Sequence, residues 1–326
     1  MMQRTILVCL FLISSNLLNA QSSPLPKYKV LKGHPPQEAL AAVNEAADQG
    51  YRVLLSARLL VMRLDATPPD TYRYQPRPES SKFNLNSFQN ALNQQGALGY
   101  AWRQDSWFLE KQPHPRNYEY RLLLDYPGKI RKQFLESFQA DGFSPVGSTG
   151  GGQVVYIHEI GSPKPAAPLR PTRVVDALRK DNLMKDISAL AAQGYRYHSH
   201  ELSRIGGGTA VSMEECDASC GGPFEYRSFD VKDAALLEQD LNALGQEGFR
   251  VVPQSLDWPP NLVERPVKHA GSFVYRVADA PDAATTQQFL DACDRDGFVA
   301  IGFAAHVGWN VHILIVTEKA MASAPQ

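Results

Sequence analysis

The sequence predicts an α+β protein of six tandem strand–helix–strand–strand (βαββ) repeats, grouped into two lobes of three repeats. Two observations predict this fold. A glycine followed by an aromatic residue recurs six times, at intervals of 43 to 54 residues, and an aliphatic residue stands seven positions before each of these glycines. Extended runs also precede the helical segments and follow most of the glycines. We therefore expect mixed, antiparallel-rich sheets with the helices on one face.

The glycines mark the ends of the predicted helices, because glycine adopts the left-handed conformation that often ends a helix without a steric penalty. Positions seven and four before the glycine are three apart and form one inward stripe. The glycines are Gly50, Gly99, Gly142, Gly194, Gly248 and Gly297. The residues seven before them are Val43, Leu92, Leu135, Ile187, Leu241 and Leu290. The residues four before them are Ala46, Gln95, Phe138, Leu190, Leu244 and Cys293.

The extended runs supply the strands of each repeat. The runs before the helices are clearest at residues 118–124, 224–229 and 273–277. The last strands are predicted at residues 58–64, 106–110, 154–160, 209–214 and 311–317. The first two strands of a repeat should run parallel through a right-handed helical crossover, and the third should return as a hairpin.

Boundaries follow from these repeats and from two segments that do not fit them. Residues 1–20 resemble a secretory signal peptide, with Arg4 before a short apolar run and Ala20 at the cut. Residues 162–171 hold four prolines and read as a stiff linker between the lobes. The six repeats are predicted at residues 26–67, 70–112, 116–161, 172–215, 223–266 and 271–319.

The predicted signal peptide and the net charge of the chain limit the class of protein. The apolar run after Arg4 is far shorter than the roughly 20 residues that span a bilayer, so we expect an exported protein with no membrane span. The location would be periplasmic or secreted. The formal net charge of −1 gives no reason to expect a nucleic-acid partner.

Two strings show a family resemblance. ALGQEGFRVVP (residues 243–253) and NQQGALGYAW (residues 93–102) resemble a small bacterial βαββ domain of unknown function, whose helix ends in Gly-Trp-Glu-Leu-Val before a hairpin. The chain departs from that pattern by having Tyr or Phe in place of Trp, without the following Glu. The resemblance implies the fold of the repeats and supplies no catalytic residue.

His198 and His200 alternate along the predicted strand after Gly194 and raise the question of a metal site. Their spacing suits two ligands of zinc or copper on one strand face, but no third ligand stands nearby at a standard spacing. Position four after the glycine is mostly apolar in the other repeats. We therefore interpret His198 as a replacement for an inward packing residue and His200 as a rim residue, with metal binding as the alternative.

The cysteines divide into two groups. Cys216 and Cys220 are separated by three residues in a turn-rich stretch, which allows a local disulfide in an exported protein. The alternatives are metal binding with the nearby histidines and an exposed redox pair. Cys293 occupies an inward helical column, where a thiol behaves as a small hydrophobe.

The remaining motifs name no reaction. The glycine triplets at residues 150–152 and 206–208 precede extended runs, so they are expected to be hairpin tips and not phosphate loops. Trp102, Trp107 and Trp309 could line a groove for a glycan or a peptide, although burial against a helix is the commoner use of such residues.

We predict an exported, non-enzymatic binding or scaffold protein, with no catalytic residue and no required cofactor. Its ligand would be a protein, a peptide or a glycan. The alternatives are a metal-binding or redox protein with its site in repeat four, and an enzyme with a site between the lobes.

Overall fold

The structure is a computed structural model that describes most of the chain. The described residues are 25–65, 71–79, 84–103, 106–114, 116–123, 133–134, 137–138, 140–148, 153–162, 172–176, 180–202, 209–216, 222–256, 259–267, 271–306 and 312–321. The predicted signal peptide, almost all of the predicted linker and both glycine triplets lie outside these segments.

Within the described residues, every complete helix occupies the place that the glycine pattern predicts. The helices are α1 (Pro36–Asp48), α2 (Leu85–Ala97), α4 (Lys180–Ala192), α5 (Ala234–Gln246) and α6 (Ala283–Arg295), with a short 3-10 turn, η3 (Pro253–Ser255). The helix of repeat three is described only at residues 133–134, 137–138 and 140. No described helix combines the length and the apolar character needed to cross a bilayer.

The strands form six three-stranded sheets, and each predicted repeat contains one of them. In every sheet the third strand lies in the middle and pairs antiparallel with the other two, so the first and second strands run parallel to each other. The α+β class is therefore confirmed. The sheets, each in chain order, are β1 (Tyr28–Lys32), β2 (Tyr51–Ser56) and β3 (Leu59–Leu64); β4 (Arg73–Pro76), β5 (Tyr100–Trp102) and β6 (Phe108–Lys111); β7 (Tyr118–Leu123), β8 (Ser144–Ser148) and β9 (Val154–Glu159); β10 (Thr172–Asp176), β11 (Tyr195–Leu202) and β12 (Thr209–Glu215); β13 (Phe224–Phe229), β14 (Arg250–Val251) and β15 (Asn261–Pro266); β16 (Ser272–Asp279), β17 (Val299–His306) and β18 (His312–Met321).

The helix-ending glycines have the conformation that the sequence predicts. All six have φ between 81° and 91°, the left-handed region that side chains other than glycine rarely adopt. Five residues of the column seven positions before the glycine are fully buried, and Leu135 lies outside the described residues. The column four positions before is fully buried only at Ala46 and Cys293 and half-buried elsewhere.

The position three before the glycine completes the buried stripe and sets how closely the repeats approach. It holds a small residue, such as Ala47 or Gly245, at the 1/2, 2/3, 4/5 and 5/6 joints, and the partly exposed Asp294 at the 6/1 joint. A Cβ on Gly245 would lie 2.3 Å from the carbonyl oxygen of Phe273, which belongs to the next repeat. The helix of one repeat thus lies directly against the first strand of the following one.

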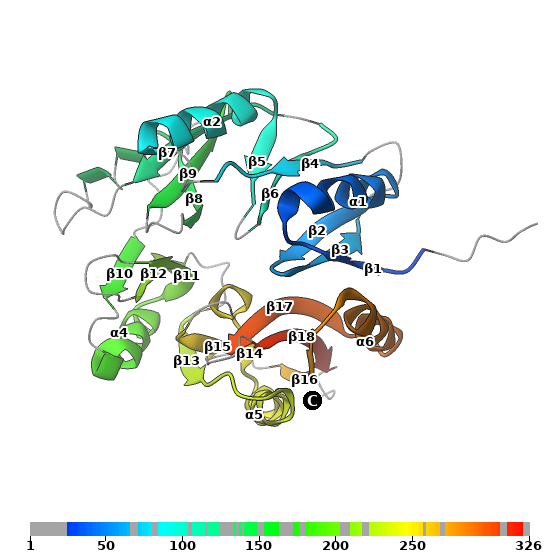
Figure 1. The fold of residues 1–326 in the computed structure, drawn as a ribbon. Coiled ribbons are helices and arrows are strands. Elements are labelled where there is room, and N and C mark those ends of the chain that lie inside the picture. Colours follow the sequence, from blue (N-terminus) through cyan, green and yellow to red (C-terminus); the bar gives the residue numbers. More distant parts are fainter. Residues whose placement is uncertain are drawn as a thin grey trace, which may run out of the picture.

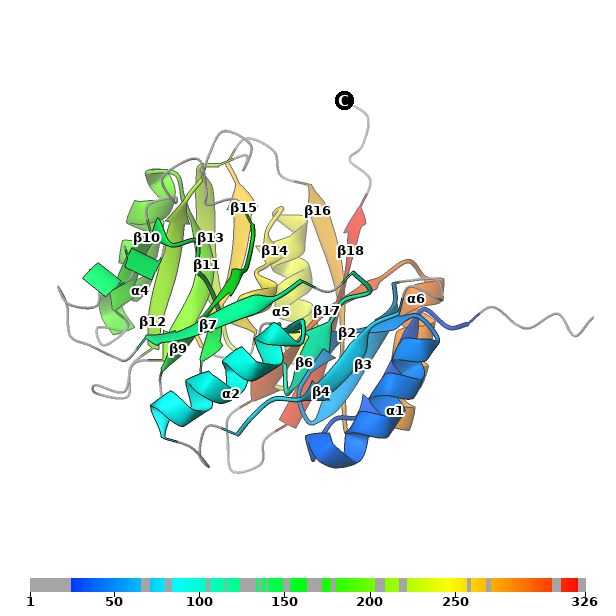
Figure 2. The same cartoon turned by 90° about the horizontal axis from the view of Figure 1, so that it is seen from above.

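These contacts arrange the repeats as a ring. We call the contact between consecutive repeats a joint and name it by its two repeats. The helices α1, α2, α4 and α5 pack on the first strands of the next repeats, and α6 packs on β1 (Figure 1). Figure 2 also places α6 beside the first repeat. In Figure 1 the described helices lie on the outside of the ring and the sheets lie towards its centre.

The 6/1 joint joins residues far apart in sequence. Tyr28 and Val61 pack in one core with Leu290 and Ile315, and the Gln287 side chain accepts from the Val30 N–H at 2.8 Å. Repeats one and six therefore share a core, which a division into two separate lobes does not predict. The 3/4 joint lies largely outside the described residues, so the lobe boundary there stays a prediction.

Candidate functional site

Three joints share a set of polar residues that we call the Arg–Glu–Tyr network. The arginine stands two positions after the helix-ending glycine. The tyrosine and the glutamate come from the first and third strands of the next repeat, where they are register partners. The networks are Arg52–Glu110–Tyr74 at the 1/2 joint, Arg196–Glu264–Tyr226 at the 4/5 joint and Arg250–Glu318–Tyr275 at the 5/6 joint.

The tyrosine hydroxyl links the two repeats. At the 4/5 joint Tyr226 donates to Glu264 Oε2 at 2.8 Å and accepts from the Tyr197 N–H at 2.9 Å. Burial, together with the adjacent glutamate, raises the pKa of Tyr226 well above its ordinary value. The phenol therefore remains protonated and available as a donor.

The arginine balances the charge of the buried glutamate. Arg52 contacts both oxygens of Glu110, with Nε–Oε2 and Nη2–Oε1 distances of 2.9 Å, and Arg196 holds Glu264 in the same bidentate manner. Arg250 contacts Glu318 through Nε at 2.8 Å. Burial raises the pKa of Glu318, and the guanidinium of Arg250 opposes this change. The networks thus join repeats through paired charges.

The 2/3 and 6/1 joints keep only the tyrosine. The hydroxyls of Tyr120 and Tyr28 accept from the N–H groups of Trp102 and Ala300 at 2.7 and 3.1 Å. The arginine position holds Ala101 or Val299, and the glutamate position holds Ile157 or Arg63. A joint can therefore form with or without the charged network.

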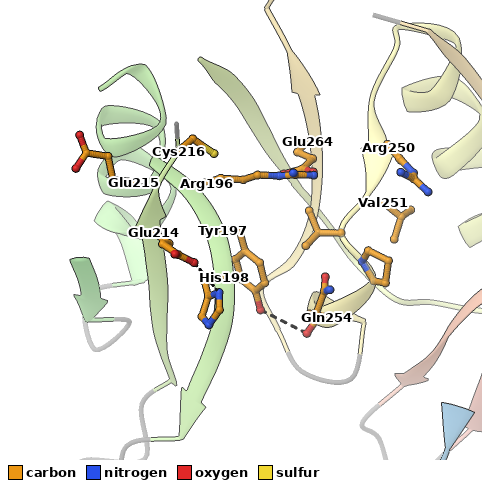
Figure 3. Close-up of a pocket in the computed structure, with 12 residues that line it drawn as sticks. Arg196, Tyr197, His198, Glu214, Glu215, Cys216, Arg250, Val251, Gln254 and Glu264 are labelled. Atoms are coloured by element: carbon orange, nitrogen blue, oxygen red, sulfur yellow. Dashed lines mark hydrogen bonds and ion pairs between the residues drawn. The ribbon is translucent and has the colours of Figure 1, made fainter. Parts of the chain in front are cut away.

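A pocket of about 480 Å³ opens beside the network of the 4/5 joint (Figure 3). Strand β11 contributes three residues, the end of β12 contributes three, and the rest come from repeat five. Tyr197 closes part of it, with its hydroxyl 3.4 Å from the Gln254 carbonyl oxygen. The lining residues are Arg196, Tyr197, His198, Glu214, Glu215, Cys216, Arg250, Val251, Val252, Pro253, Gln254 and Glu264.

His198 lies on a β-bulge and faces this pocket. The register of β11 against β12 shifts between Tyr197 and Ser199, so His198 is the extra residue. Its side chain is 39% exposed, and its Nδ1 is 3.2 Å from Glu214 Oε2. This differs from the expected inward position. The physical reason is the polar imidazole, which contacts the Glu214 carboxylate at the edge of the strand in place of the apolar core.

The same bulge recurs at position four in three other repeats, at Leu54, Val146 and Ile301. These side chains are half-buried. Of the six residues at this position, Val252 alone is fully buried. Leu54, Val146 and Ile301 nevertheless pack against hydrophobic cores, so the apolar residues of this column do face inward and His198 departs from them.

The other predicted site residues are placed only in part. The backbone of His200 pairs opposite Val211, and its side chain lies outside the described part of the structure. Cys216 lines the pocket and is not a free thiol, while Cys220 lies outside the described residues, so the Cys216–Cys220 disulfide stays a prediction. Among the described residues no three His, Cys, Asp or Glu side chains gather as metal ligands would. Zinc or copper binding through His198 and His200 also stays a prediction.

Cys293 and the tryptophans take no part in the pocket. Cys293 is buried, its Sγ accepts a hydrogen bond from Thr317, and burial raises the pKa of its thiol. Trp102 is buried under the Arg77 guanidinium, which lies 4.2 Å from the ring centre, and Trp107 is 39% exposed. Trp309 lies outside the described residues.

Reasoning from the sequence missed the Arg–Glu–Tyr network, although a signal was present. Arg52, Arg196 and Arg250 stand at one offset from their glycines, in a column that an alignment of the repeats displays. Their glutamate partners lie 58 or 68 residues further along the chain, and only the fold brings them together.

Comparison with protein-family models, with curated proteins and with solved structures finds no match to this chain. The resemblance to a bacterial domain of unknown function therefore stays an expectation, and any functional inference depends on the chain's own residues.

Proposed function

We propose that this chain is an exported, non-enzymatic repeat protein that binds a ligand in the periplasm or outside the cell. The observation that carries the proposal is the pocket at the 4/5 joint. Its volume of about 480 Å³ lies within the roughly 300–1,000 Å³ typical of small-molecule sites. Side chains from two repeats converge on it, as in ligand sites formed between structural units.

The polar groups around the pocket favour recognition by a preformed surface. Glu264 is held by Arg196 and Tyr226, and His198 is held by Glu214. Groups fixed in this way lose little conformational entropy when a ligand binds. A protein, peptide or glycan segment could each supply complementary hydrogen-bonding groups.

Thermal unfolding of the full chain with a panel of oligopeptides and oligosaccharides tests the proposal. A ligand that binds only the folded state raises the midpoint temperature by an amount that grows with the logarithm of the ligand concentration once this exceeds Kd. Gln254→Trp, which places a large ring at the mouth of the pocket, should abolish the shift. Gln193→Trp, at an exposed position just after α4 that does not line the pocket, is the matched control and should retain it. No shift from any member of the panel would overturn the proposal.

Metal binding by repeat four is the second candidate. It is supported by the contact between His198 Nδ1 and Glu214, because a carboxylate of this kind often orients a histidine whose other nitrogen binds metal. Metal analysis of the purified protein and of the His198→Ala/His200→Ala variant tests it. Stoichiometric zinc or copper that disappears in the variant would favour this candidate, and metal at background level would exclude it.

A further inference from the structure

The pocket at the 4/5 joint has a counterpart at the 1/2 joint that is almost filled. The counterpart has a volume of about 30 Å³, roughly the space of one water molecule. It is lined by Val53, Leu54, Arg103 and Glu110, among others. The first two correspond to Tyr197 and His198 by their offsets from the helix-ending glycines.

Arg103 closes the space at the 1/2 joint. It stands four residues after Gly99, and its Nε donates to Glu110 Oε1 at 3.1 Å. Glu110 therefore accepts from two arginines, Arg52 and Arg103, and from Tyr74. Its two oxygens share four hydrogen bonds, which is about the acceptor capacity of a carboxylate.

The 4/5 joint lacks the second arginine. The residue four after Gly248 is Val252, which is buried and carries no donor. Glu264 also accepts four hydrogen bonds, three from Arg196 and one from Tyr226, the counterparts of Arg52 and Tyr74. The joints therefore differ in the partners of the glutamate, because Glu264 has no counterpart of Arg103, and not in the number of bonds. In Figure 3, Arg196 reaches across to Glu264, and Val251 and Gln254 lie beside the open space. The two joints thus differ in the partner of the buried glutamate at this position. They also differ elsewhere, because Arg250, which is paired with Glu318, lines the pocket where the 1/2 joint has Ala101.

The charges around the pocket also favour a cation. Arg196 is neutralised by Glu264, and Arg250 is paired with Glu318 of repeat six. The lining also contains Glu214 and Glu215. Of these two carboxylates, Glu214 contacts His198. Carboxylates beside a partly enclosed space attract a positive group more strongly than they would in open water.

We propose that the pocket at the 4/5 joint binds a guanidinium group, which takes the place that Arg103 occupies at the 1/2 joint. The group would belong either to a small guanidinium compound or to an arginine side chain of a peptide. This inference rests on the proposed binding function and names the ligand class for its site.

Isothermal titration calorimetry of the full chain tests the ligand class. The probes are agmatine, a blocked tripeptide with a central arginine, and the same tripeptide with citrulline, which is neutral and of nearly equal shape. Binding of the citrulline peptide should be at least about tenfold weaker than that of the arginine peptide, because a charge-assisted hydrogen bond is lost. Tighter binding of agmatine indicates a small molecule, and tighter binding of the tripeptide indicates a peptide. Equal affinity for arginine and citrulline would overturn the inference.

Two substitutions at one exposed residue locate the site. Gln254→Arg brings a guanidinium to the pocket, and we expect the arginine peptide to bind at least about tenfold more weakly. Gln254→Glu adds an acceptor at the same position and should strengthen binding. Unchanged affinity in both variants would place the site elsewhere and overturn the inference.

A reciprocal pair of variants tests the equivalence of the joints. Val252→Arg should supply the missing guanidinium and abolish binding, and Arg103→Val should open a second site and raise the stoichiometry above one. Val252 is buried, so Val252→Arg could abolish binding by unfolding the protein. The two variants at the exposed Gln254 should remain folded, and they therefore test binding alone. If peptides or glycans stabilise the protein but none of the guanidinium probes binds, the proposed function stands and this inference fails. If nothing binds, both fail.

Discussion

At the 1/2 joint Glu110 binds two arginines and a tyrosine, whereas at the 4/5 joint Glu264 binds one arginine and a tyrosine. The strand order and the register of the two joints are the same. The side chain four residues after the glycine differs, and so do other residues around the space, whose volume is about 30 Å³ at the 1/2 joint and about 480 Å³ at the 4/5 joint. A repeated backbone thus provides equivalent spaces, and the side chains around each space decide how far it is filled.

The helix side of the two joints differs as well. At the 1/2 joint, Asn44 of α1 accepts from the Tyr74 N–H at 2.9 Å and donates to the Tyr74 carbonyl oxygen at 3.0 Å. Asn93 and Asn242 make the same pair of bonds to Tyr120 and Tyr275. The equivalent residue of α4 is Ser188, whose side chain is too short to make both bonds. The 4/5 joint is therefore the less tightly bonded of the two on its helix side.

The largest effect is expected from the buried carboxylates. Glu110→Gln should lower the free energy of unfolding by about 3 kcal/mol and Glu264→Gln by about 2 kcal/mol, because the first removes the acceptor of two arginines and the second of one. Urea denaturation at constant m-value measures both. Glu159→Gln is the control, since its partner Arg116 is exposed, and it should change stability by less than about 1 kcal/mol. Equal losses at Glu110 and Glu264 would contradict the comparison.

The tyrosine hydroxyls should have the next largest effect. Tyr226→Phe leaves the buried Tyr197 N–H without its acceptor and removes one of the donors to Glu264, and should cost about 2 kcal/mol. Tyr120→Phe should cost about 1 kcal/mol, because its hydroxyl donates to the neutral carbonyl oxygen of Tyr100. Thermal unfolding of the two variants checks the order. A larger loss at Tyr120 would show that the charged network adds nothing to the joint.

The asparagine bonds between helix and strand predict a variant of higher stability at the 4/5 joint. Ser188→Asn should raise the free energy of unfolding by up to about 1 kcal/mol by making the bonds to β13 that Asn44 makes to β4. Ser188→Ala is the matched control and should leave stability nearly unchanged. The reverse change, Asn44→Ser, should cost about 1 kcal/mol. Chemical denaturation of the three variants measures these changes. A Ser188→Asn variant no more stable than the wild type would show that the asparagine bonds do not stabilise the joint.

The smallest effect is expected at His198. His198→Leu installs the side chain that Leu54 supplies at the 1/2 joint and removes the contact with Glu214, whose members are both about one-third exposed. Such pairs contribute at most about 1 kcal/mol, so the stability should change by less than that. A loss of several kcal/mol in urea denaturation would mean that His198 is a packing residue after all.

Local patterns in the sequence predict much of the fold. The glycine column predicts helix ends with positive φ, and the strand predicted at residues 224–229 is β13. These features depend on neighbouring residues along the chain. The bulge at His198 could not be read in the same way, because it is defined by the register of β11 against β12.

The candidate site depends on contacts that the sequence does not record. Arg196 is recognisable as one of three arginines at the same offset, but its partner Glu264 lies 68 residues away. The pocket is lined by residues of two repeats, and the difference between Val252 and Arg103 can be recognised only when the two joints are compared in the structure. The contact of Gln287 with Val30 spans 257 residues, and no local signal predicts it.

The contact of Gln287 with Val30 limits how repeats can be added to or removed from this fold. An open stack of repeats ends in units that need polar caps, and it can gain or lose a unit at either end. Here the Lys27–Asp294 ion pair at 2.8 Å and the hydrogen bond of Gln287 to Val30 connect β1 and the residue before it to α6. Repeats one and six therefore cover each other, and neither exposes its packing surface to a further repeat. Insertion or deletion of a single unit would require every remaining joint to change its angle. The number six is therefore held by geometry, and variation is confined to the side chains within each joint.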